Sequence, residues 1–180
     1  MTYFRPLILC SMLLVAGPAG AGKPGDAQVE EPDKESSEQR VELFDNNKAE
    51  TLCKLKGRVC LRAGTGTEAE GSETAPSPSF KRRAGQRGDW ILDLYGMFKV
   101  PSLAGNAQFI FSDVADSKAN KAREVTALYQ VTVKAGGSVS AKVRLSPDDG
   151  FRVGRQYRAQ IVQLLNGKEV LLAEGDFQLK

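Results

Sequence analysis

The second half of this 180-residue chain alternates apolar and polar side chains with a period of two. Such a period places successive side chains on opposite faces of a strand, so that one face can be buried while the other is solvated. No segment with helical periodicity competes with it. The β-compatible runs are residues 90–98, 107–111, 125–133, 139–145, 157–165 and 170–179, the last with a break near Gly175. The chain is therefore predicted to be all-β and antiparallel.

Two hairpins can be placed within this region. If Ala135-Gly136-Gly137 is a three-residue loop, Val133 faces Val139 and the apolar residues of both strands share one face. Asn166-Gly167 predicts a second hairpin, since both residues tolerate the positive φ of a tight turn. Trp90, with the following apolar residues of its run, is predicted to lie in the core, whereas Tyr95 has the opposite parity and is expected to be exposed.

Turn residues at Pro147, Gly150 and Gly154 precede Tyr157, which opens a strand. This arrangement resembles the tyrosine corner of immunoglobulin-like and fibronectin III-like sandwiches, in which the hydroxyl group bonds back to the preceding crossover. The resemblance is one of fold and implies an antiparallel β-sandwich over residues 89–180. Tyr157 is then a structural residue and not a catalytic acid.

Cys53 and Cys60 are close in sequence, and an oxidising compartment would join them. With Lys56-Gly57 as a two-residue turn, the cysteines face each other across a hairpin at disulfide range. Residues 41–62 are accordingly expected to form short strands that belong to the sandwich or lie beside it. Zinc is a poor alternative because the chain has no histidine and the residues between the cysteines are basic.

The N-terminus reads as an export signal over residues 1–21: Arg5 precedes a short apolar run, and small residues lead up to a cleavage site near Ala21. The expected location is periplasmic or secreted. Leu9 before Cys10 fits poorly with lipidation of that cysteine, which is the minor alternative. Residues 22–40 are rich in acidic, glycine and proline residues and are predicted to be a disordered tether.

Residues 63–88 contain few large apolar side chains and are predicted to be a flexible loop or linker. Four basic residues near the end of this segment are a candidate contact patch: Lys81, Arg82, Arg83 and Arg87. A solvated connection is the plainer interpretation of these residues.

The absence of histidine excludes imidazole bases, histidine-dependent nucleophile systems and histidine-ligated metals. Ser140 and Lys142 share a face that is predicted to be solvated, where a lysine makes a poor base. Acidic residues at 113, 116, 148 and 149 fit no calcium-binding loop. No catalytic residue, cofactor or metal is therefore assigned, and a net charge of +3 gives no footprint for nucleic acid.

These observations favour an exported, non-enzymatic binding or structural accessory module of the cell envelope or secreted fraction that recognises a protein partner. An exposed strand edge would be the natural binding surface, because its main-chain groups are unpaired. The alternative is a small carboxylate-dependent hydrolase or polysaccharide-active enzyme. No membrane span is expected after signal cleavage, and the sequence assigns no oligomeric state.

Overall fold

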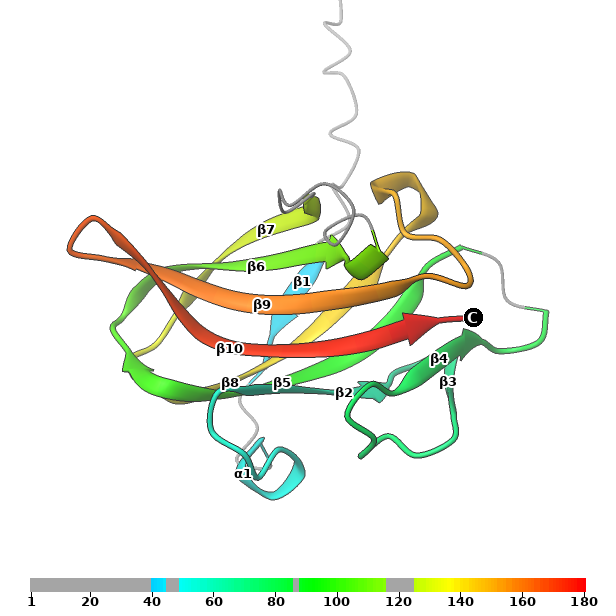
Figure 1. Ribbon diagram of the computed structural model, residues 1–180, viewed down its shortest axis with the longest axis horizontal. Coiled ribbons are helices and arrows are strands. Elements are labelled where there is room, and N and C mark those ends of the chain that lie inside the picture. The colour runs from blue at the N-terminus through cyan, green and yellow to red at the C-terminus, as the bar shows by residue number, and fades with distance from the viewer. Residues whose placement is uncertain (1–39, 45–48, 86–87, 116–124) are drawn as a thin grey trace, which may run out of the picture. The chain divides into compact units, whose positions relative to one another are not determined.

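Ten strands make up nearly all of the regular structure in a computed structural model, which describes residues 40–44, 49–85, 88–115 and 125–180 (Figure 1). The predicted export signal and nearly all of the acidic tether lie outside these residues. Among the described residues, none of the helices has the length and apolar character required to cross a bilayer. The strands are β1 (Val41–Leu43), β2 (Arg58–Ala63), β3 (Thr67–Glu70), β4 (Ser79–Arg82), β5 (Trp90–Ser102), β6 (Gly105–Asp113), β7 (Val125–Val133), β8 (Gly136–Leu145), β9 (Gln156–Leu165) and β10 (Lys168–Leu179).

The strands of the unit that spans residues 38–180 form one strongly curled sheet in the order β1-β8-β5-β2-β10-β9-β6-β7. Neighbouring strands within β1-β8-β5-β2 and within β10-β9-β6-β7 are antiparallel. A short parallel contact between Arg58 and Glu174 joins these two halves. The sheet is nearly barrel-shaped, with β1 and β7 at its two ends. The all-β prediction is confirmed, whereas the immunoglobulin-like sandwich in particular is not.

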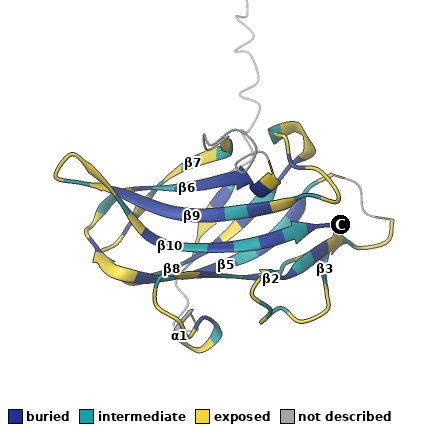
Figure 2. Ribbon diagram, in the orientation of Figure 1, coloured by how far each residue is buried: buried dark blue, intermediate teal, exposed yellow. Residues whose placement is uncertain are grey.

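The core lies between the two halves and follows the alternation of the sequence. Leu92 and Leu94 of β5 point inward with Phe109 and Phe111 of β6, and all four are almost fully buried. Trp90 is a core residue, as predicted. Figure 2 shows buried segments along β6, β9 and β10, and an exposed turn between the last two strands. Burial of this continuous apolar face is the main stabilising contribution to the fold.

The predicted pairing of residues 125–133 with residues 139–145 is wrong. β7 pairs with β6, and β8 pairs with β5 and β1. Both strands do present their apolar face to the core, but they do so from different parts of the curled sheet. Alternation determines which face of a strand is buried, but it does not determine which strand pairs with it.

The hairpin at Asn166-Gly167 is confirmed: Leu165 pairs with Lys168, and both turn residues have positive φ. The predicted break near Gly175 is absent, because β10 runs through this position. Gly175 instead allows β10 to approach β2, since a Cβ atom there would lie only 3.1 Å from the carbonyl carbon of Val59 and still closer to its oxygen.

Two strands, β3 and β4, lie within residues 63–88, so the prediction of a flexible loop over that whole range is wrong. β3 pairs with β4, and β4 pairs in parallel with the end of β10. Phe80 is the one large apolar residue of β4 and is completely buried. A strand with one core residue and several polar neighbours is held by non-local pairing, and its own sequence carries little strand signal.

Cys53 and Cys60 form the predicted disulfide, with their Cα atoms 5.5 Å apart. The predicted strand around Cys53 is wrong, because the short helix α1 (Ala49–Leu52) precedes the cysteine and a turn leads into β2. Cys53 packs on Tyr95 in a small cluster on the outer face of β5. Tyr95 is therefore only 5% exposed, contrary to the expectation of an exposed ring.

The hydroxyl group of Tyr157 accepts a hydrogen bond of 2.7 Å from the backbone N–H of Arg152, five residues upstream. This is the contact that a tyrosine corner requires. The Tyr157 ring is buried between Phe151 and Phe177. Burial raises the pKa of the hydroxyl group above its usual value of 10, against a smaller effect of the backbone hydrogen bond.

Candidate functional site

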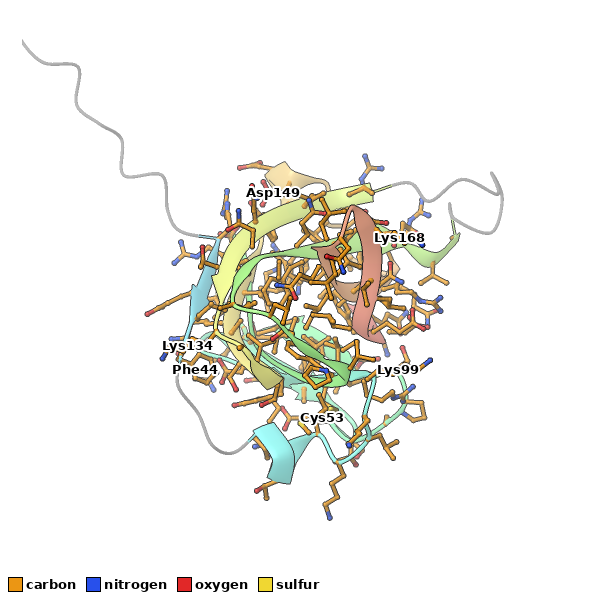
Figure 3. All side chains as sticks on the ribbon, turned by 90° about the vertical axis from the view of Figure 1, so that its left-hand side faces the viewer. Phe44, Cys53, Lys99, Lys134, Asp149 and Lys168 are labelled. Atoms are coloured by element: carbon orange, nitrogen blue, oxygen red, sulfur yellow. A yellow bond between two sulfur atoms is a disulfide. The ribbon has the colours of Figure 1, made fainter. Side chains whose placement is uncertain are left out.

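The two end strands of the sheet face each other across a groove, here called the edge groove. It has a volume of about 570 Å³ and is lined by residues 40–43 on one side and 128–132 on the other. Figure 3 shows β1 and β7 side by side, with Asp149 near one end of the groove and Phe44 and Lys134 near the other. The volume lies within the range of ordinary ligand pockets.

Backbone groups of β1 point into this groove. In an antiparallel ladder, alternate residues direct both their N–H and C=O groups to the partner strand. Arg40 accepts a bond from Arg144 of β8, and Phe44 donates one to Ser140 of β8. The residues of opposite parity, Val41 and Leu43, must therefore direct their groups away from β8. Within the described part of the chain, neither residue has a backbone partner on that side.

The inner and outer walls of the edge groove differ in polarity. Tyr129 and Val131 of β7 pack against the core cluster that includes Val41. The residues of β7 with opposite parity, which are Leu128, Gln130 and Thr132, are exposed. A segment lying in the groove would thus meet apolar side chains on its inner face and a mixture of polar, apolar and charged side chains, Glu42 among them, on its outer face.

A polar network joins the two walls at one end of the groove. The guanidinium group of Arg40 lies 3.0 Å from Asp89 and 3.4 Å from Asp149. The Tyr129 hydroxyl group donates a 3.0 Å hydrogen bond to the same carboxylate oxygen of Asp149. Burial and the negative charge of Asp149 raise the pKa of Tyr129 far above 10, so this donor keeps its proton at neutral pH.

The predicted basic patch is largely engaged within the fold. Arg82 stacks on Trp90 at 4.4 Å and donates to the carbonyl group of Gly88. Lys81 and Arg83 both pair with Glu68 of β3. Arg87 lies outside the described residues. These bases hold β4 to its neighbours, and a contact role for them stays a prediction.

Two of the acidic residues considered for a metal or for catalysis, Asp113 and Asp149, are also paired. Asp113 and Asp149 line one hollow of about 240 Å³ together with two arginines. Asp113 accepts a hydrogen bond from the backbone N–H of Ala115 and lies 3.5 Å from Arg155. Asp116 and Asn120 lie outside the described residues. In the described segments, no three potential metal-ligating side chains of the His, Cys, Asp and Glu types gather at one point.

Ser140 and Lys142 share the outer face of β8, as predicted. Lys142 is exposed, whereas Ser140 is buried. Lys142 is opposite Asp93 of β5. Burial raises the pKa of Asp93, and the positive charges of Lys142 and Arg62 oppose that shift. The arrangement resembles a cross-strand charge pair more than a nucleophile with its base.

The edge groove was missed by the sequence because it depends on which strands end the sheet. A strand signal is present in residues 41–44 and in residues 125–133. This local signal does not predict that the two strands flank the same opening. The chain matches no family model, no curated protein and no solved structure.

Proposed function

We propose that this chain is an exported, non-enzymatic binding module that recognises a protein partner by accepting an extended segment of it in the edge groove. The single observation that supports this most is the pair of facing strand edges, with the backbone groups of Val41 and Leu43 directed between them. Only a polypeptide offers a matching row of N–H and C=O groups. Export rests on the N-terminal sequence, and an immunoglobulin-like relationship rests on the bond between Arg152 and Tyr157.

The walls of the groove indicate which segments would fit. The inner side chains of the segment would contact Val41, Tyr129 and Val131, so they should be apolar. The outer side chains would lie beside Gln130 and Thr132 and can be polar. An alternating sequence of about four or five residues matches the length of the wall formed by residues 128–132. The alternative enzyme would need free acids, whereas Asp113 and Asp149 both pair with arginines.

The test compares two substitutions at one position. Leu43→Pro removes an N–H group that faces the groove and is not used by β8, whereas Leu43→Ala keeps that group and shortens the side chain. The two variants and the wild type would be cross-linked to secreted or envelope proteins of the source cells. We expect one partner to be captured by the wild type and by L43A, and lost with L43P.

A folded-state control accompanies the capture. L43P must retain the thermal unfolding transition of L43A to within a few degrees, and hydrogen exchange of the captured complex should slow at residues 128–132. Equal capture by L43P and L43A, or protection confined to other strands, would contradict the proposal.

A further inference from the structure

A second hollow, here called the cap pocket, lies on the outer face of β2. It has a volume of about 500 Å³. One wall is formed by α1 and the disulfide-closed turn, and the other by the segment that leads from Glu73 to Pro78. Figure 1 shows both segments projecting from the same side of β2. None of its lining residues belongs to the edge groove.

Both walls are fixed to the sheet. The disulfide holds Cys53 to β2, and Cys53 is completely buried on Tyr95. On the opposite side, the carboxylate of Glu73 accepts hydrogen bonds of 2.9 Å from the backbone of Ala63 and 3.0 Å from the side chain of Arg62. The pocket is therefore formed before a ligand arrives, which lowers the entropic cost of binding.

Eight of the fourteen described residues that line the cap pocket are apolar, and they lie on both walls. Leu52 and Leu55 contribute from one wall, and Ala75, Pro76 and Pro78 from the other. The side chain of Leu55 is 65% exposed, although the wall that carries it is covalently closed. An exposed leucine at the mouth of a pocket adds apolar surface that an incoming chain can cover.

The charge of the cap pocket is positive. Arg62 is paired with Glu73, so these two groups neutralise each other. Lys54 and Arg58 also line the pocket, are exposed, and have no ion pair in the described segments. A hollow with apolar side chains on both walls and two available cations complements a molecule that has an apolar body and an anionic end.

We infer that the cap pocket binds a small amphiphile with an alkyl chain and a terminal carboxylate. The chain lies against Leu55 and Pro76, and the carboxylate pairs with Lys54 and Arg58. Arg58 supplies a planar fork that fits both carboxylate oxygens, and Lys54 adds a second positive charge. The cap pocket is separate from the edge groove, so either proposal can fail without the other.

Calorimetric titration of the full mature chain with decanoate, below its micelle concentration, tests this inference. We expect one decanoate per chain, with acetate and 1-decanol each binding at least about tenfold more weakly, since each lacks one half of the ligand. Decanoate that fails to bind, or that binds no more tightly than 1-decanol, would overturn the assignment.

Substitutions locate the ligand. The double variant Lys54→Gln/Arg58→Gln should weaken decanoate at least about tenfold while leaving 1-decanol unchanged, because only the charge-assisted bonds are removed. Lys168→Gln, at the exposed first position of β10 and far from the lining of the cap pocket, is the control and should change neither ligand. An equal loss in the double variant and the control would show nonspecific charge attraction and refute the site. The variants are checked by circular dichroism, and their exposed positions make misfolding a minor concern.

Discussion

Gly175 is expected to be indispensable for the contact that joins the two halves of the sheet. Its position in β10 is directly over the backbone of β2: a Cβ atom would lie 3.1 Å from the carbonyl carbon and 3.2 Å from the Cβ atom of Val59, with the carbonyl oxygen nearer still. The neighbouring Glu174 donates a 3.0 Å hydrogen bond to Gly57, so β10 cannot move away without breaking this bond. The obstacle is backbone, which has no alternative rotamer.

The magnitude of the effect follows from these contacts. Overpacking in a close-packed interior costs about 1–3 kcal/mol. Loss of the Glu174 bond adds about 1 kcal/mol. The lower entropy of the unfolded alanine chain returns about 0.4–1 kcal/mol. Gly175→Ala should therefore destabilise the fold by about 1–3.5 kcal/mol, which lowers the melting temperature of a unit of this size by roughly 3–12 °C.

Thermal and urea unfolding of the purified mature chain measure this change. Gly137→Ala is the matched control, because a Cβ atom there meets nothing within 4 Å and its φ is not positive. It should leave stability unchanged or raise it by up to about 1 kcal/mol. If the two alanine variants melted within 2 °C of each other, the close approach of β10 and β2 would be refuted.

Three further predictions concern single contacts. Tyr157→Phe removes the acceptor of the Arg152 N–H group and should cost about 1 kcal/mol in urea unfolding, whereas no cost would show that the hydroxyl group is free. Replacing both Cys53 and Cys60 by serine should lower the free energy of unfolding by about 2 kcal/mol. The intact mass of the wild type should rise by two hydrogens on reduction, and two free thiols in the exported protein would contradict the disulfide. Burial and then Asp149 raise the pKa of Tyr129, so the protonated hydroxyl group stabilises the fold fully below pH 10, and this contribution is lost as the pH rises further. The free energy of unfolding of Tyr129→Phe should therefore fall less steeply above pH 10 than that of the wild type, and identical alkaline profiles would refute the raised pKa.

The sequence predicted the strands better than it predicted their neighbours. The alternation around Leu92 and Phe109 correctly gave buried faces, and Asn166-Gly167 correctly gave a hairpin, because both signals are local. The predicted pairing of β7 with β8 was wrong because a strand with one apolar face can cover the core from either half of the sheet, and the alternation does not tell which half it joins. β4 was missed because its strand geometry comes from pairing with β3 and with β10, the latter almost one hundred residues away.

The candidate site shows the same limit. The cysteines were paired correctly from their spacing, but the first strand of the predicted hairpin was wrong because residues 49–52 form α1, which packs beside Tyr95. The edge groove could not be foreseen, since residues 41–43 and 128–132 become neighbours only when the sheet curls. An unpaired edge is a property of strand order, and strand order was not encoded in the alternation.

β1 and β7 flank an opening without pairing, and nuclear Overhauser contacts between backbone protons test this arrangement most directly. We expect cross-strand contacts between Val41 and Val143 and between Phe109 and Tyr129, with none joining residues 41–43 to residues 128–132. We also expect faster amide exchange at Leu43 than at Phe44, whose N–H group bonds to Ser140. A regular ladder of contacts between β1 and β7, with equal protection at both amides, would contradict this arrangement.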